Sequence, residues 1–179
     1  GELIHYDSVA TFTDGVTQED MDTLEGDLSA DGHIDDFLLN CGYSDDVKSS
    51  EDTETAEYVI VDDKNAFKDY VTLRTRRKHN DVVLGDSGVV ITEKLSKDLG
   101  IKKGDKITVT SSTGKQTEAV VSGITEMYVN HYIYISTEYY NELFGNVPDN
   151  NRVLIKINGD VSETESYMGD EYLTRDYIK

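Results

Sequence analysis

The chain has 179 residues, of which 37% are hydrophobic and 30% are charged, a composition typical of a folded globular protein. Its formal net charge of −19 excludes a nucleic-acid-binding role, because such proteins bind phosphates through clustered lysines and arginines. No run of about 18 consecutive apolar residues occurs, so we expect no membrane-spanning helix within this sequence. The abrupt start at Gly1, without a secretion signal, is typical of a fragment cut from a longer protein.

The charge is unevenly distributed along the chain. Residues 1–63 carry 19 acidic residues and one lysine, for a net charge of −18. Residues 64–115 have a net charge of +6, and residues 116–179 one of −7. A basic middle between acidic ends predicts an inserted subdomain with a surface of its own. The alternative is an ordinary fluctuation whose charges pair across the fold.

The first third of the chain predicts the order β-α-β-β. Thr17 and Asp20 form an acidic variant of a capping box, and Met21, Leu24 and Leu28 then recur on one helical face. The segments on either side are rich in β-branched and aromatic residues. The expected elements are a strand at 6–13, a helix at 17–28, and strands at 34–43 and 56–63.

The middle of the chain predicts short strands and short helices that end at glycines. Thr92 and Ser136 are typical helix N-caps, and Gly100 and Gly145 are typical helix stops. The expected elements are a hairpin of 70–78 with 82–84, a strand and helix over 88–100, two strands within 105–129, and a strand and helix over 131–145.

The end of the chain predicts a strand at 152–157 and a helix from Ser162 to about Tyr172. The last six residues, "TRDYIK", end where a closing strand would be needed. We therefore expect the second β-α-β motif to be incomplete in this sequence.

One stretch resembles a known family. The run "GVVITEKLSKDLGIKKGDKITVTSSTGKQTEAVVSGITEMYVNHYIYISTEYYNELFG" is similar to the extracytoplasmic core domain of FtsX-like, MacB-like ABC-transporter permeases. The similar features are Gly88-Val89-Val90-Ile91 before a short helix, the run from Leu99 to Asp105, the Gly123-Ile124 step, "HYIYI" and "YYNELFG". The resemblance is close over about sixty residues and looser elsewhere.

The resemblance implies an α+β fold. Residues 1–63 plus 148–179 would form a split β-α-β base made by both chain ends, and residues 64–147 an inserted, mainly β subdomain with short helices. The linkers at 62–65 and 146–151 would act as hinges between them.

The resemblance also implies a function and a location. The chain would be an extracytoplasmic domain at the cell membrane, flanked by membrane helices, that couples the motion of those helices to an extracellular substrate. Its implied partners are a cytoplasmic ATPase and an extracellular protein, peptide or lipoprotein, and no bond chemistry is expected in this fragment. The alternatives are a secreted carbohydrate- or peptide-binding module, and a small hydrolase that uses paired carboxylates at 35/36, 45/46 or 62/63.

The segment "GDLSADGHIDDF" resembles a calcium-binding loop, with oxygen-bearing side chains at Asp27, Ser29, Asp31 and Asp35 and a turn at Gly32. The twelfth position from Asp27 is Leu38, where an EF-hand needs a bidentate glutamate. We therefore interpret the segment as the bend between a helix and a strand.

The sequence contains no recognisable catalytic, metal or cofactor motif. The histidines, at 5, 33, 79 and 131, show no zinc-ligand spacing, and we interpret His131 as a hydrogen-bonded structural histidine. Cys41 is the one cysteine, so no internal disulfide forms, and we expect this thiol to be buried. We expect no cofactor.

Two groups of residues are candidates for contact with a partner. One is the basic run Arg74, Arg76, Arg77 and Lys78, and the other is the pair Tyr132 and Tyr134. The alternative interpretations are a charged edge hairpin that discourages sheet pairing and tyrosines packed in the core.

Overall fold

The computed structural model describes residues 2–12, 17–158 and 173–177, and its chain divides into two compact units. Unit 1 consists of residues 1–41, 65–72 and 149–179, and unit 2 of residues 42–64 and 73–148. The α+β class expected from the sequence is confirmed. In the described part of the chain, no helix has both the length and the apolar character needed to cross a bilayer.

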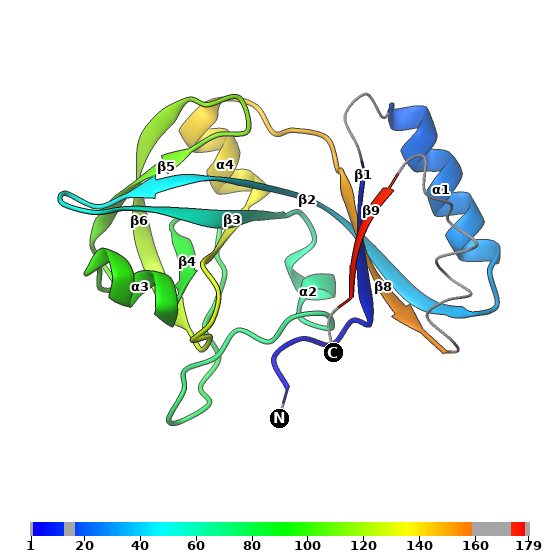
Figure 1. Ribbon diagram of the computed structural model, residues 1–179, viewed down its shortest axis with the longest axis horizontal. Coiled ribbons are helices and arrows are strands. Elements are labelled where there is room, and N and C mark those ends of the chain that lie inside the picture. Colours follow the sequence, from blue (N-terminus) through cyan, green and yellow to red (C-terminus); the bar gives the residue numbers. More distant parts are fainter. Residues whose placement is uncertain (1, 13–16, 159–172, 178–179) are drawn as a thin grey trace. The chain divides into compact units, whose positions relative to one another are not determined.

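Unit 1 is an antiparallel sheet covered by one helix. Its strands lie in the order β2-β8-β1-β9, and only the first part of β2 belongs to this unit. Figure 1 shows the helix α1 lying beside these strands. The elements are β1 (Ser8–Phe12), α1 (Gln18–Ala30), β2 (Ile34–Lys48), β8 (Arg152–Ile157) and β9 (Leu173–Tyr177).

The helix α1 forms where the sequence predicts it. The Thr17 side chain accepts a hydrogen bond from the Asp20 amide, and Asp20 accepts one from the Thr17 amide, so the capping box is complete. The apolar face of the helix packs on β1 and β8. The buried core there consists of Ala10, Phe12, Met21, Leu28, Val153 and Ile155.

Both ends of the chain build this sheet. Ser8 of β1 pairs with Ile155 of β8 and with Tyr177 of β9, so β1 lies between two strands from the chain's C-terminal part. The expectation that the last residues lack a closing strand is wrong, because Leu173–Tyr177 pairs with β1 along its length. The helix expected from Ser162 to Tyr172 lies outside the described residues.

Unit 2 is a closed, mixed barrel. Its strands follow the order β3-β7-β4-β6-β5-β2, and β3 also pairs with β2, which closes the ring. The pairs β3–β7 and β4–β6 are parallel, and the pairs β4–β7, β5–β6 and β2–β5 are antiparallel. Besides the second part of β2, the strands are β3 (Thr53–Val61), β4 (Val89–Thr92), β5 (Lys106–Thr110), β6 (Gln116–Thr125) and β7 (Tyr132–Ser136).

Two short helices follow strands of this barrel. The helix α3 (Glu93–Leu99) follows β4 and ends at Gly100, and α4 (Thr137–Phe144) follows β7 and ends at Gly145. Both glycines are left-handed, with φ of 67° and 81°, as the predicted C-caps require. The largest fully buried side chains of this unit include Tyr58, Ile60, Ile91, Leu95, Ile133, Ile135 and Tyr140.

The predicted hairpin of 70–78 with 82–84 is wrong as a pair of strands. In this part of the chain Arg74 and Asp81 form an isolated bridge around a turn in which His79 has a φ of 53°. The Arg74 carbonyl accepts a hydrogen bond from the Glu126 amide instead, at 2.8 Å, which draws this segment toward the end of β6.

The chain passes between the units after residues 41, 64, 72 and 148. The predicted division placed residues 42–63 with the two chain ends, whereas the second part of β2 and β3 are counted here with unit 2. The acidic charge of this stretch set the predicted border, and the strand pairing of β3 with β7 ties it to the barrel. The short helix α2 (Lys64–Phe67) begins at one of these passages.

Candidate functional site

Two of the predicted contact residues are held by carboxylates of unit 2. The Arg74 Nε atom donates to Glu126 at 2.8 Å, and the Arg76 Nε atom donates to Glu93 at 3.1 Å. The hydrogen bond from Arg74 lowers the pKa of the Glu126 carboxyl. The guanidinium of Arg76 also stacks on the Tyr128 ring, 3.7 Å from its centroid. The structure therefore brings Arg74 and Arg76, the first two residues of the basic run, to the β6–β7 loop.

The other two basic residues of the run are exposed. Arg77 and Lys78 lie in the turn that ends at Asn80, where the Thr75 amide donates to the Asn80 carbonyl. Their charged groups therefore face solvent beside a segment that is fixed by Arg74 and Arg76.

The two predicted tyrosines lie on β7 and differ in burial. Tyr134 is 4% exposed and belongs to the core, whereas Tyr132 is partly buried. Their ring centroids are 5.9 Å apart in a tilted arrangement. Since Tyr134 packs inside the barrel, of this pair only Tyr132 has surface to offer a partner.

A shallow hollow of about 290 Å³ opens beside Tyr132. It lies where the β2–β3 hairpin, the start of α3 and the β6–β7 loop meet. The residues that line it are Ser44, Thr55, Ala56, Glu57, Lys94, Val129, Asn130, His131 and Tyr132.

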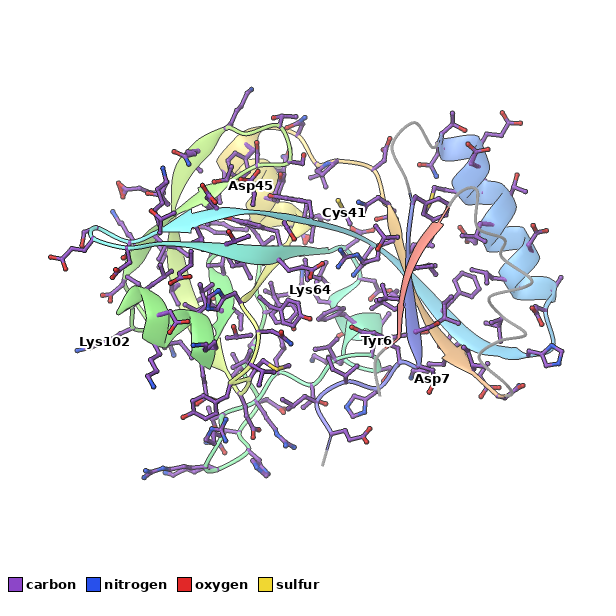
Figure 2. All side chains as sticks on the ribbon, in the orientation of Figure 1. Tyr6, Asp7, Cys41, Asp45, Lys64 and Lys102 are labelled. Carbon is purple, nitrogen blue, oxygen red and sulfur yellow. The ribbon has the colours of Figure 1, made fainter. Side chains whose placement is uncertain are left out.

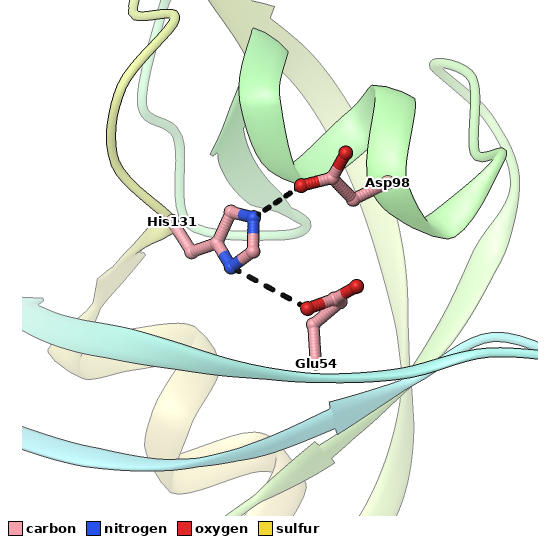
Figure 3. A group of neighbouring side chains, drawn as sticks. All are labelled: Glu54, Asp98 and His131. Atoms are coloured by element: carbon pink, nitrogen blue, oxygen red, sulfur yellow. Dashed lines mark hydrogen bonds and ion pairs between the residues drawn. The ribbon is translucent and has the colours of Figure 1, made fainter.

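His131, at the rim of this hollow, joins three elements of the barrel (Figure 3). Its Nε2 atom lies 2.7 Å from an Asp98 carboxylate oxygen on α3. Its Nδ1 atom lies 3.0 Å from the Thr55 carbonyl oxygen on β3. The predicted role of a hydrogen-bonded structural histidine fits these contacts.

Among the described residues, Glu54, Asp98 and His131 form a group that could hold a metal ion, with ligand atoms within 4.8 Å of one another. The geometry favours hydrogen bonding over ligation. The Asp98 carboxylate lies 2.7 Å from Nε2, whereas Nδ1 contacts the Thr55 carbonyl at 3.0 Å and has Glu54 at 3.9 Å, so both ring nitrogens already have partners within the protein. Lys94 also binds Asp98, at 2.9 Å, and supplies the positive charge there.

The segment that looks like a calcium loop is the end of α1 and the start of β2, as interpreted from the sequence. The Asp31 carboxylate accepts from the His33 amide at 2.8 Å. The Asn158 side chain donates to Asp35 at 2.6 Å and to the Gly32 carbonyl at 3.2 Å. These acceptors therefore fix the bend between helix and strand.

Cys41 is buried, as expected, at 4% exposure. Burial raises the pKa of its thiol from 9.0 to about 11, so at neutral pH the group is a protonated, unreactive thiol. Figure 2 shows its position on β2.

Sequence reasoning considered Tyr128 with the other tyrosines of this region as a contact candidate, but it missed the exposed Val129 and the grouping of His131 with Glu54 and Asp98. The three members of that group come from β3, α3 and the β6–β7 loop, so no local spacing relates them. A signal for Tyr128 and Val129 was present, because two large apolar residues interrupt a polar loop between two strands.

No protein-family model and no curated protein sequence matches the chain. Several solved structures, however, are similar to the chain. One is the periplasmic region of MacB from Actinobacillus actinomycetemcomitans, with 14% identity, a TM-score of 0.50, and coverage of 97% of this chain and 90% of that one. Another is the extracellular domain of the noncanonic ABC-type transporter YknZ from Gram-positive bacteria, with 12% identity, a TM-score of 0.52, and coverage of 90% and 87%.

At this level of identity the likeness concerns the fold. It extends over nearly the whole chain, including the looser N- and C-terminal parts of the sequence resemblance. The chain therefore has the α+β fold of MacB-like extracytoplasmic domains, as the resemblance of residues 88–145 implied.

Proposed function

We propose that this chain is the extracytoplasmic domain of an FtsX-like ABC-transporter permease, at the outer face of the cell membrane. In this role it performs no bond chemistry. It couples ATP-driven motion of membrane helices to an extracellular substrate or partner protein, and its cytoplasmic partner is the transporter's ATPase. The fold shared with the MacB and YknZ domains supports the proposal.

The observation that carries the proposal is the pairing of β1 with β9. Ser8, at the start of β1, lies opposite Tyr177, at the end of β9. The chain thus enters and leaves unit 1 at the same end of two paired strands. A unit of this kind fits between two neighbouring membrane helices, and any displacement of those helices acts directly on the β1–β9 pair.

The passages of the chain between the units supply candidate hinges. The linkers 62–65 and 146–151 contain two of the four passages, after residues 64 and 148. Pro148, in the second linker, fixes its own backbone and carries no amide that needs a partner. We propose that changes in these linkers let unit 2 move as a body relative to unit 1.

The flanking coding sequence tests the location. We expect an apolar stretch of about 20 residues on each side of the chain, long enough to cross a bilayer. Cysteines introduced at exposed positions of the full-length protein should then react with a membrane-impermeant maleimide in intact cells. A hydrophilic linker on both sides would favour a secreted binding module instead.

Distance measurements test the coupling. Spin labels at Glu25→Cys in α1 and Lys102→Cys before β5, in a Cys41→Ser background, report on the two units. Lys102 projects away from the ribbon in Figure 2 and is exposed. In the permease reconstituted with its ATPase, we expect the distance distribution to change between the nucleotide-free and the vanadate-trapped state.

The control pair for this measurement is Lys102→Cys with Lys115→Cys, because both exposed residues lie in unit 2. Its distance distribution should stay the same in both states. If the pair that spans the two units also stays unchanged, the coupling role is wrong even where the location is right.

A further inference from the structure

The loop between β6 and β7 presents two adjacent large side chains to solvent. Tyr128 is 51% exposed and Val129 is 75% exposed. Single exposed apolar residues are common on protein surfaces, but this pair lies beside a hollow that Val129 helps to line. The loop is therefore a candidate for contact with another molecule.

The backbone of this loop is fixed from both sides. The Glu126 amide donates to the Arg74 carbonyl at 2.8 Å, and the Met127 carbonyl accepts from the Lys94 amide at 3.0 Å. The Asn130 carbonyl accepts from the Thr92 hydroxyl at 2.7 Å. A loop held in this way loses little conformational entropy on binding, which favours affinity.

The surroundings of Tyr128 and Val129 are positively charged on one side. Arg76 stacks on Tyr128 and is balanced by Glu93, whereas the next two residues, Arg77 and Lys78, are exposed. On the side of the hollow, Lys94 pairs with Asp98 and neutralises that carboxylate, and Glu57 also lines the hollow, so the excess of positive charge lies on the side of Arg77 and Lys78. In a chain of net charge −19, the exposed cations that follow Arg76 in the sequence make that side of the Tyr128–Val129 pair complementary to carboxylates.

We propose that Arg77, Lys78, Tyr128 and Val129 form a docking surface, the basic-apolar patch, for a segment of an extracytoplasmic partner protein that carries an apolar side chain flanked by carboxylates. The apolar side chain would pack against Val129 in the adjoining hollow, and the carboxylates would meet Arg77 and Lys78. The proposal rests on the proposed function for the existence of such a partner, and it narrows the partner's chemistry.

An anionic lipid surface fits the patch less well than a protein segment. The acidic character of the rest of the chain would be repelled by such a surface, and a headgroup has no apolar group to fill the hollow.

Defined peptides and the isotope-labelled protein test the proposal. The probe is the peptide Asp-Glu-Leu-Asp-Glu between Gly-Ser flanks, titrated into the protein while its amide resonances are followed by NMR. We expect shifts of the Lys78, Tyr128 and Val129 amides, with a dissociation constant of the order of 1 mM, since the contact is small. The peptides Lys-Lys-Leu-Lys-Lys and Asp-Glu-Ser-Asp-Glu, in the same flanks, should bind at least about tenfold more weakly.

Matched variants separate the patch from the rest of the surface. Val129→Ser should weaken binding of the acidic peptide about tenfold, and Val83→Ser, at a site with 73% exposure, should leave it unchanged. The pair Arg77→Glu with Lys78→Glu should abolish binding, whereas Lys102→Glu with Lys103→Glu should not, although both pairs are exposed. All four changes are at the surface, and unchanged amide dispersion confirms folding.

Three results would overturn the proposal. The first is that the acidic peptide shifts amide resonances outside the basic-apolar patch, or that the basic peptide shifts the patch resonances with the same affinity. The second is binding of the protein to phosphatidylserine vesicles that is lost in the Arg77→Glu, Lys78→Glu variant, with no peptide binding. The third is concentration-dependent self-association that Val129→Ser removes. Each leaves the distance test of the coupling role unaffected, so the two proposals fail separately.

Discussion

Tyrosine hydroxyls serve as backbone partners inside unit 2. The Tyr58 hydroxyl donates to the Asp46 carbonyl at 2.6 Å and accepts from the Thr110 amide at 3.0 Å. The Tyr58 ring is 1% exposed and stacks on Tyr43, so burial raises the pKa of its hydroxyl, which stays protonated and able to donate. One side chain therefore joins the ends of β2 and β5.

Tyr58→Phe should destabilise the protein by about 1 to 3 kcal/mol. The ring still fits, but the buried Thr110 amide loses its acceptor, whereas the Asp46 carbonyl keeps the hydrogen bond from the Thr110 hydroxyl at 2.8 Å. Thermal or urea unfolding measures the change. Tyr128→Phe is the matched control, because its ring is 51% exposed, and its effect should stay below about 0.5 kcal/mol. Equal effects of the two changes would contradict the role given to the Tyr58 hydroxyl.

The Asp98 carboxylate contributes a pH-dependent part of the stability. Hydrogen bonds from Lys94 and then His131 lower its pKa below the ordinary value of 3.8. A lowered pKa in the folded state means that the stabilisation is complete above the unfolded pKa, and that it is lost as the pH falls through the folded one. The charge, and not only the shape, of Asp98 therefore matters above about pH 5.

Asp98→Asn should lower the midpoint of thermal unfolding at pH 7, and its deficit relative to the wild type should shrink as the pH falls below about 4. Unfolding curves of both proteins between pH 7 and pH 3 measure this. The neighbouring Lys97→Gln, on the same helix and without a role in this group, should show no such trend. A deficit that is constant with pH would mean that Asp98 acts by packing alone.

Among the secondary-structure elements, those defined by local signals could be predicted from the sequence. The capping box at Thr17 and the left-handed glycines Gly100 and Gly145 lie where their helices begin or end. Thr92 shows the limit of such signals. It occupies the N-cap position of α3, but its hydroxyl makes no cap bond and donates to the Asn130 carbonyl instead.

Elements that depend on distant partners could not be predicted. The 70–84 segment fails to form a hairpin because Arg74 bonds to Thr125 and Glu126, which are 51 and 52 residues away. The closing strand β9 forms by pairing with the edge of β1 that β8 does not occupy. The grouping of Glu54, Asp98 and His131 is a product of the same long-range pairing, so the candidate site was beyond local reasoning.

The start of β4 requires glycine for two separate reasons. Gly88 has a φ of +83°, and a Cβ atom there would lie 2.5 Å from the Ser122 Cβ of β6. Gly114, in the β5–β6 turn, also has a positive φ, of +88°, but a Cβ atom added there would have no other atom within 4 Å. Gly88 opens the stretch that resembles the transporter family, and its environment gives a physical reason for glycine at that position.

Gly88→Ala should destabilise the protein more than Gly114→Ala. Both changes carry the backbone cost of about 1 to 2 kcal/mol for a left-handed non-glycine residue. Only Gly88→Ala adds an overlap between β4 and β6, which should bring its total to about 3 kcal/mol or more. Urea unfolding measures both. Equal losses in the free energy of unfolding would mean that β6 shifts to accommodate the added methyl group without destabilising the protein.

At the scale of the whole molecule, the arrangement of the chain suggests two units that are stable independently. Unit 2 takes its strands from the middle of the chain, whereas unit 1 is assembled from both ends and residues 65–72. For unit 1, the barrel is equivalent to two inserted loops, and the entropic cost of long loops rises only slowly with length. Damage to one unit should therefore spare the other, a property that suits bodies that move relative to each other.

Two matched cavity variants test this independence. Ile155→Ala removes side-chain atoms from the core of unit 1, and Ile133→Ala does the same in the core of unit 2. Both isoleucines are 0% exposed. Each should cost about 2 to 5 kcal/mol in its own unit. Hydrogen exchange followed by mass spectrometry should show Ile155→Ala exposing β1 and β8 while β4 and β7 stay protected, and Ile133→Ala doing the reverse. Exchange that rises in both units with either variant would mean that they unfold as one body, and hinge motion about 62–65 and 146–151 would then lose its structural basis.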